Sequence, residues 1–267
     1  MKNLLTTLAI LAFLHSCANK PVSTTPTPTT PTPTPVDLRA GIRKIVESST
    51  SCSDYYWKNR GKAPKSYIEG MALMYAKQVC GQGSDFIKPN KITGSNKYGT
   101  YNDALNHYSL SGGELNTYTF LIGLGMRESS GKYCTGRDRS QNFTHSRSAE
   151  AGLFQMAYVA RVFNSRMESI YEKYKSGELS CELEAFKQES IKCTSYDAKT
   201  FGTGEGATWQ KLMKKCPAFS TQWAAILIRS QYKHFGPIIR KDAEFRTQCR
   251  DMLSKVGEIS KSNCDQL

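Results

Sequence analysis

Glu128 is the residue of this sequence whose type and position best suit acid–base chemistry. It stands near the end of residues 111–131, SGGELNTYTFLIGLGMRESSG, whose apolar side chains predict a helix inside a domain. In the last turn of such a helix, the helix dipole and the apolar surroundings both disfavour a carboxylate anion. We therefore expect Glu128 to hold a proton and to donate it as a general acid. The alternative is an ion pair with Arg127 or Lys132 at a solvated helix end.

A turn that follows the helix holds further groups with suitable chemistry. Residues 148–155 read SAEAGLFQ, and Gly152 predicts a turn that lays backbone groups and the amide of Gln155 beside Glu128. Glu150 stands immediately before this turn and is a candidate second carboxylate. Because glycosidases place carboxyl groups on both sides of the scissile bond, these pieces predict a glycan-cleaving site.

The flanking residues predict where the central helix begins and ends. Ser111, followed three residues later by Glu114, has the pattern of a capping box and predicts a start near Gly112. Gly131 has the position of a C-terminal glycine that ends a helix. Further helical segments are expected at 38–60, 66–79, 101–108, 157–175, 181–193, 219–235 and 241–256.

The segments between these helices predict loops and little β-structure. We expect a long loop up to about residue 100, an ordered polar loop pinned by Cys134, and a mobile loop at 202–206, GTGEG. One small hairpin is expected near 135–156. The sequence therefore predicts a mainly α domain, stapled by disulfides, with at most a small β-hairpin.

The first residues indicate export. Residues 1–17, MKNLLTTLAILAFLHSC, have a basic start, an apolar core and small residues before Cys17, as secretory signals do. The last four of them resemble a bacterial lipobox, which predicts a lipid anchor on Cys17; an ordinary signal peptide is the alternative. We expect a periplasmic or outer-membrane-anchored lipoprotein, or a secreted protein. The Pro/Thr-rich residues 18–37 predict an extended spacer, and 38–267 one domain.

Cysteine usage and charge narrow the function classes. The chain has nine cysteines, and removal of Cys17 leaves eight, which in an exported protein predict four disulfides of undetermined pairing. No CxxC or HExxH motif occurs, so neither a metal site nor a cofactor is expected. The net charge of +13 suits acidic envelope polymers or membrane surfaces. No motif for nucleic-acid binding accompanies it, and a monomer is expected.

Two motifs together resemble the lysozyme-like superfamily, in particular goose-type lysozymes and soluble lytic transglycosylases. Those proteins carry a catalytic Glu before Ser at a helix end and then a GLMQ-like turn, which RESSG at 127–131 and GLFQ at 152–155 match. The similarity covers residues 111–160 well and 222–238 weakly. It implies a lysozyme-like helical fold and cleavage of the β-1,4 bond between N-acetylmuramic acid and N-acetylglucosamine, with Glu128 as the acid. It also implies substrate contacts by Ser129, Gly152, Leu153, Phe154, Gln155, Tyr232 and His234.

The sequence departs from this family in ways that concern the second catalytic group. The two motifs are farther apart than usual, and Ala157 stands where goose-type enzymes tend to have an aspartate. Glu150 is our first candidate for a water-activating base, and Asp138 is the second. The alternative for Glu150 is a salt bridge to a neighbouring arginine. A lytic transglycosylase needs no such base, because the muramic 6-hydroxyl attacks and gives an anhydro product.

Three hypotheses therefore remain open. The first is a muramidase that acts on peptidoglycan strands from a membrane anchor, as a hydrolase or a lytic transglycosylase. The match is also similar to lysozymes of predatory bacteria that act on deacetylated peptidoglycan. The second is a non-catalytic peptidoglycan-binding lipoprotein on the same fold. The third is an exported inhibitor or partner-binding protein, which leaves the motifs between residues 126 and 155 unexplained.

Overall fold

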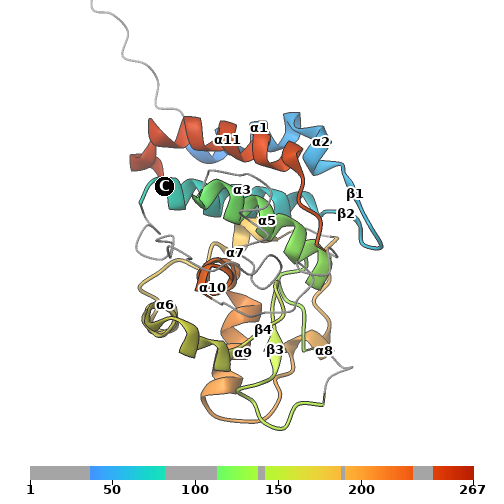
Figure 1. The fold of residues 1–267 in the computed structure, drawn as a ribbon, viewed down its shortest axis with the longest axis vertical. Helices are drawn as coiled ribbons and strands as arrows, with labels where there is room; N and C mark the ends of the chain where they lie inside the picture. The colour runs from blue at the N-terminus through green and yellow to red at the C-terminus, as the bar shows by residue number, and fades with distance from the viewer. Residues whose placement is uncertain (1–36, 82–112, 138–141, 188–189, 231–242) are drawn as a thin grey trace, which may run out of the picture. The chain divides into compact units, whose positions relative to one another are not determined.

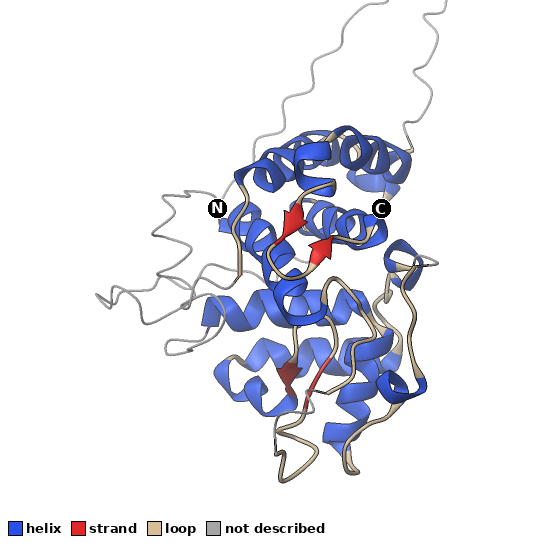
Figure 2. Ribbon diagram, turned by 90° about the vertical axis from the view of Figure 1, so that its right-hand side faces the viewer, coloured by secondary structure: helices blue, strands red, loops and turns tan. Residues whose placement is uncertain are grey.

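The described part of the chain is mainly helical and includes two small antiparallel strand pairs (Figure 2). The chain divides into two units, residues 1–35 and 36–267, and every described residue belongs to the second. The structure, a computed structural model (Figure 1), describes residues 37–81, 113–137, 142–187, 190–230 and 243–267. The predicted mainly α, disulfide-stapled domain is thus confirmed, with one strand pair more than expected.

Helix α5, Gly113–Ser129, is the element against which the other large helices pack. It contacts α3 (Lys65–Val79), α10 (Pro217–Ser230) and α11 (Thr247–Lys261), and in Figure 1 it lies below α11 and above α10. Every residue from Asn116 to Met126 is buried. A helix that is apolar nearly all round is therefore inside the domain, as its sequence predicted.

The end of α5 lies where Gly131 predicted it. Ser130 and Gly131 both adopt left-handed backbone conformations, with φ of 55° and 75°. The N–H of Gly131 donates to the carbonyl of Gly125 at 3.2 Å, and that of Ser130 to Met126 at 3.0 Å. A Cβ at position 131 would come within 2.8 Å of the Tyr67 ring, so the position requires glycine.

The N-terminal helices form one side of the packing around α5. Helix α1, Leu38–Ser48, begins at the N-cap Asp37, whose carboxylate accepts from the backbone N–H groups of the first turn, and it packs on α3 and α11. The short α2, Thr50–Ser53, follows. Strands β1, Tyr56–Trp57, and β2, Gly61–Lys62, then form the first hairpin, where the sequence had predicted continued helix.

The second side of the packing is built on α10 and a cluster of aromatic rings. Helices α6 (Ser165–Ser176) and α9 (Glu205–Lys215) pack against α10 and against each other. The ring contacts in this core join Tyr158, Tyr171, Tyr174, Trp209, Phe219 and Trp223. Of the smaller elements, α8 (Ser195–Ala198) packs on α9, and α7 (Leu183–Phe186) packs on α3 and α10. The short η2 (Cys264–Gln266) follows α11, and Gln266 accepts from the N–H of Leu38 at 3.2 Å.

The second hairpin lies within the turn region that the sequence singled out. Strand β3, Glu150–Ala151, pairs with β4, Met156–Ala157, and Glu150 stands directly opposite Ala157. A 3₁₀ helix, η1, continues the chain from Tyr158 to Phe163. The predicted hairpin is therefore present, and it brackets the GLFQ turn.

Four disulfides staple the unit, as the cysteine count predicted. Their pairs are Cys52–Cys249, Cys80–Cys264, Cys134–Cys193 and Cys181–Cys216. The predicted pinning of the loop after α5 by Cys134 is confirmed, because its bond to Cys193 ties that loop to the segment before α8. Four disulfides indicate folding in an oxidising extracellular or periplasmic compartment. No helix in the described ranges combines the length and apolar character that a membrane span needs.

Several predicted helix boundaries are wrong for local reasons. The expected helix at 157–175 is interrupted at Asn164, whose side chain accepts from the N–H of Arg166 at 3.0 Å and so caps a new helix, α6. The helix expected at 181–193 is only the four-residue α7. Helix α11 begins later than the predicted residue 241 and extends to Lys261.

The loop predicted at 202–206 was also wrong in its extent. Gly204 has φ of 74° and directly precedes α9, a helix that the sequence did not predict and that includes Glu205 and Gly206. Helix α10 begins two residues before the predicted start, with Pro217 in its first turn, where proline suits a helix. The expected helix at 101–108, the start near Gly112 and the end of the 219–235 segment lie outside the described residues.

Candidate functional site

Three residues singled out in the sequence line one cleft. Glu128 at the end of α5, Glu150 on β3 and Gln155 of the turn surround a cavity of about 380 Å³. The β1–β2 loop, the loop after α5 and α8 complete its walls. They contribute Arg60, Thr135, Gly136, Arg137, Tyr196 and Asp197. The predicted proximity of the GLFQ turn to the helix end therefore agrees with the cleft, whereas the catalytic roles of these residues stay predictions.

The C-terminal half of α5 is held by hydrogen bonds from Ser129 and Tyr67. Ser129 is buried, and its hydroxyl donates to the carbonyl of Gly125 at 2.9 Å. Tyr67 donates to the carbonyls of Leu121 and Ile122 at 3.0 and 2.8 Å, and its hydroxyl oxygen leaves no room for a side chain at Gly125. The hydroxyl of Ser129 is therefore engaged within the helix, and this residue contributes to the position of Glu128.

The GLFQ turn is anchored by its first three residues. Gly152 has φ of 79°, and a Cβ there would lie 2.7 Å from the carbonyl oxygen of Met213, so no other residue fits. The side chains of Leu153 and Phe154 are 0% and 2% exposed. Their predicted role as direct substrate contacts needs correction, because both side chains belong to the core. The aromatic ring of Phe154 packs beside Gly125 of α5 and so connects the turn to the helix that carries Glu128.

Gln155 forms part of the cleft wall. Its φ of 45° is unusual for a residue with a side chain. Its Nε2 donates to the carbonyls of Gly136 at 3.0 Å and of Gly152 at 2.9 Å. The side chain therefore links the turn to the loop after α5, and the described residues provide no donor for its Oε1.

The register of β3 and β4 shows to which face of the hairpin the side chain of Glu150 projects. It is partly exposed and lines the cleft, and its cross-strand neighbour is Ala157. Directly opposed residues of an antiparallel pair project to the same face of the sheet. The side chain of Glu150 thus projects to the same face as that of Ala157.

Asp197 is a buried cleft residue that the sequence reading missed. Its Oδ2 accepts from Lys132 Nζ at 2.5 Å and from the N–H and hydroxyl of Thr194 at 2.8 and 2.7 Å, while its Oδ1 accepts from the Gly136 N–H at 3.1 Å. Burial raises the pKa of Asp197, but these donors outweigh it and lower the pKa to about 2. Since both oxygens are occupied, Asp197 orders the wall of the cleft. The local capping box of Thr194 and Asp197 was the available signal.

Lys214 holds the backbone of Asp197 in place. The buried ammonium group donates to the carbonyls of Asp197 and Lys199 at 2.7 and 2.5 Å, and so holds the end of α8. Burial lowers the pKa of Lys214 to about 8; Asp197 acts in the opposite direction, and the nearby Lys211 and Lys215 lower it further. A chain of contacts therefore runs from α9 through α8 to Gln155 at the cleft.

Four residues of the sequence prediction cannot be placed. Tyr232, His234, Asp138 and the lipidation candidate Cys17 lie outside the described residues. In the part of the chain that the structure describes, no group of three or more His, Cys, Asp or Glu side chains has an arrangement suited to a metal ion.

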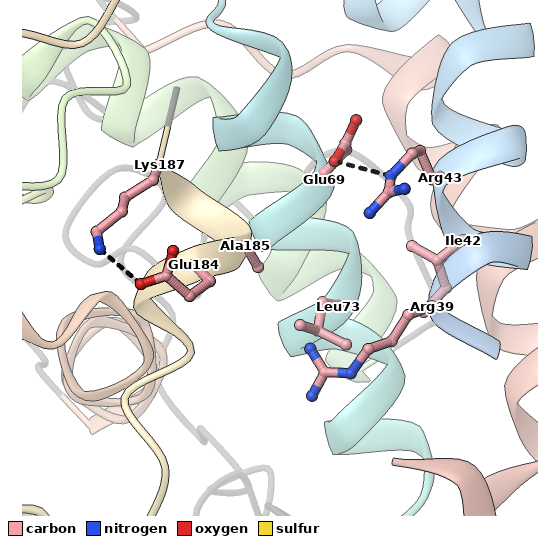
Figure 3. A pocket seen from close by; sticks show the side chains of 8 residues that line it. All are labelled: Arg39, Ile42, Arg43, Glu69, Leu73, Glu184, Ala185 and Lys187. Carbon is pink, nitrogen blue, oxygen red and sulfur yellow. Dashed lines mark hydrogen bonds and ion pairs between the residues drawn. The ribbon is translucent and has the colours of Figure 1, made fainter. Parts of the chain in front are cut away.

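Another cavity, of about 360 Å³, lies between α1, α3 and α7 and is a weaker candidate (Figure 3). In Figure 3 Arg43 points toward Glu69, and Lys187 toward Glu184. Arg39, on the same wall, pairs with the buried Glu182 at 3.1 Å. Because its charged groups neutralise one another and none of the predicted site residues lines it, this cavity offers no comparable chemistry.

Comparison with known protein families, with curated proteins and with solved structures finds no match to this chain.

Proposed function

We propose that this protein is a lysozyme-like muramidase that cleaves the β-1,4 bond between N-acetylmuramic acid and N-acetylglucosamine in peptidoglycan. The observation that supports this most is the meeting of Glu128, Glu150 and Gln155 in one cleft. Glu128 and Gln155 belong to the two motifs that resemble goose-type lysozymes and lytic transglycosylases, and Glu150 stands just before the second motif. The four disulfides suit a protein that works in the cell envelope.

In this proposal Glu128 is the general acid. It protonates the glycosidic oxygen while the sugar on the other side of the bond develops oxocarbenium character. Ser129, the Gly125 carbonyl and the left-handed turn at Gly131 hold the helix end so that the carboxyl group keeps its direction. In this proposal the Oε1 of Gln155 accepts a hydrogen bond from a sugar hydroxyl or N–H group.

The second step distinguishes two reactions. In a hydrolase, Glu150 removes a proton from water, which attacks the anomeric carbon, and the proton given up by Glu128 leaves with the released sugar. Asp197 is unsuited to this role, because both of its oxygens accept hydrogen bonds from protein groups. In a lytic transglycosylase the muramic 6-hydroxyl attacks the anomeric carbon instead of water, and Glu128, which has given its proton to the leaving oxygen, takes the proton of that hydroxyl.

A digest of purified glycan strands, with products identified by mass, tests the proposal. We expect shorter strands whose reducing ends are either free or 1,6-anhydro, and these ends differ by one water. Intact strands together with binding to the wall would instead support a non-catalytic peptidoglycan-binding lipoprotein on this fold. The same assay on acetylated and deacetylated strands decides whether the enzyme prefers either.

A further inference from the structure

A second cavity, different from the one between α1, α3 and α7, shares one lining residue with the cleft that contains Glu128. It has a volume of about 340 Å³ and lies between α7, α8, α9 and the Cys134–Cys193 disulfide. Asp197 lines both this cavity and the cleft, so the two spaces meet at α8. The remaining lining residues are Tyr133, Leu183, Thr194, Ala198, Lys211, Lys214 and Lys215.

The cavity combines an apolar floor with a positively charged wall. Tyr133, Leu183, Ala198 and the disulfide provide apolar surface. Three lysines of α9 stand at positions 211, 214 and 215, and residues three and four apart share one face of a helix. Asp197 is the only acid that lines the cavity among the described residues, and Lys132 and Thr194 already engage its carboxylate.

Among the described residues, acidic side chains compensate little of the positive charge of this wall. Lys211 and Lys215 are exposed, and neither has an acidic partner in the described segments. Lys214 has neutral carbonyl oxygens as its hydrogen-bond acceptors. Burial, and then the repulsion from Lys211 and Lys215, keep the pKa of Lys214 at about 8 despite the attraction of Asp197. An anion in the cavity would relieve this repulsion.

We infer that this second cavity binds the acidic peptide of the wall polymer while the glycan strand lies in the cleft. The peptide branches from the muramic sugar next to the bond that Glu128 is proposed to cleave. Its carboxylates suit Lys211 and Lys215, and its small apolar side chains suit the floor made by Tyr133, Leu183 and Ala198. That floor favours a peptide over a bare phosphate group. The choice of this peptide rests on the proposed function, whereas its binding can be measured without cleavage.

Calorimetry with a soluble wall peptide that carries free carboxylates tests the inference. The double variant Lys211→Gln/Lys215→Gln should bind roughly 3- to 30-fold more weakly, since each exposed ion pair contributes up to about 1 kcal/mol. The matched control is Lys44→Gln/Lys255→Gln, which removes the same charge from exposed sites on α1 and α11 and should bind as the wild type does. Amidation of the peptide carboxylates should weaken its binding to the wild type by a similar factor.

The outcomes separate this inference from the proposed function. Absence of peptide binding to the wild type, equal binding by the double variant, or equal binding of the amidated peptide would each overturn it, even if the glycan is cleaved. Weaker peptide binding by Lys211→Gln/Lys215→Gln, with normal binding by the control Lys44→Gln/Lys255→Gln, would support the inference even if purified strands remain intact. In an active enzyme, the double variant should cleave peptide-bearing strands more slowly than the wild type does and peptide-free strands equally well.

Discussion

Replacement of Asp197 by asparagine tests how the cleft wall is held, because the Asp197 carboxylate accepts hydrogen bonds from Lys132, Thr194 and Gly136. Asparagine keeps the shape of the side chain, but it removes the negative charge and turns one oxygen into an N–H donor. The donors of Lys132 and Thr194 would then face an amide that can satisfy only some of them. The carbonyl of Gly136, whose N–H also bonds Asp197, accepts from Gln155, so the effect should reach the cleft.

The size of the loss follows from the pKa of Asp197. A lowering from the ordinary 3.8 to about 2 corresponds to about 2 kcal/mol of stabilisation of the charged form. Solvent near the site screens part of this, and we expect Asp197→Asn to lower the free energy of unfolding by about 1–2 kcal/mol at pH 6. The contribution is fully present above pH 3.8 and is lost as the pH falls toward 2, where the carboxyl group itself becomes neutral.

Urea unfolding with the disulfides intact, at pH 6 and near pH 2, measures this effect. The difference between the wild type and Asp197→Asn should be large at pH 6 and should nearly vanish at the lower pH. Asp251→Asn, which alters an exposed aspartate on α11, is the matched control and should change little at either pH. A difference of the same size at both pH values, or none at pH 6, would refute the assigned role of the charge.

Three further variants test the remaining parts of the site. Glu150→Gln should slow a hydrolase at least about 100-fold and leave anhydro products of a transglycosylase largely unchanged; a near-normal rate of hydrolysis would dismiss Glu150 as the base. Gly152→Ala should lower the free energy of unfolding in urea by about 2–4 kcal/mol, because its φ is 79° and a Cβ would meet the Met213 carbonyl; an unchanged midpoint would contradict this. Loss of the Cys134–Cys193 bond by double alanine substitution should lower that free energy by about 2–4 kcal/mol and slow cleavage; unchanged unfolding and activity would show that the bond is dispensable.

The sequence predicted the features that depend on local chemistry. The end of α5 could be predicted because Gly131 adopts a conformation that other residues rarely adopt. The GLFQ turn could be predicted from Gly152 for the same reason. Helix α9 was missed because its buried face includes polar residues, Gln210 and Lys214, which interrupt the apolar pattern.

Contacts between segments that are far apart in the chain could not be predicted from the sequence. The capping box at Thr194 is local, but the ion pair of Asp197 with Lys132 spans 65 residues and depends on how the whole domain packs. The disulfide pairing could not be predicted from the sequence for the same reason, since the paired cysteines are 35 to 197 residues apart. Phe154 looked like a substrate contact because of its motif, and only the packing against Gly125 identifies it as an anchor.

The rate at which Glu128→Gln cleaves purified glycan strands tests the central claim most directly. The substitution keeps the shape of the side chain and removes the transferable proton, so we expect cleavage to fall at least about 100-fold, with the melting temperature and strand binding retained. Glu178→Gln, at an exposed glutamate that pairs with Lys173 at 2.9 Å, is the matched control and should cleave as the wild type does. A Glu128→Gln protein that cleaves strands at a rate near that of the wild type would contradict the account.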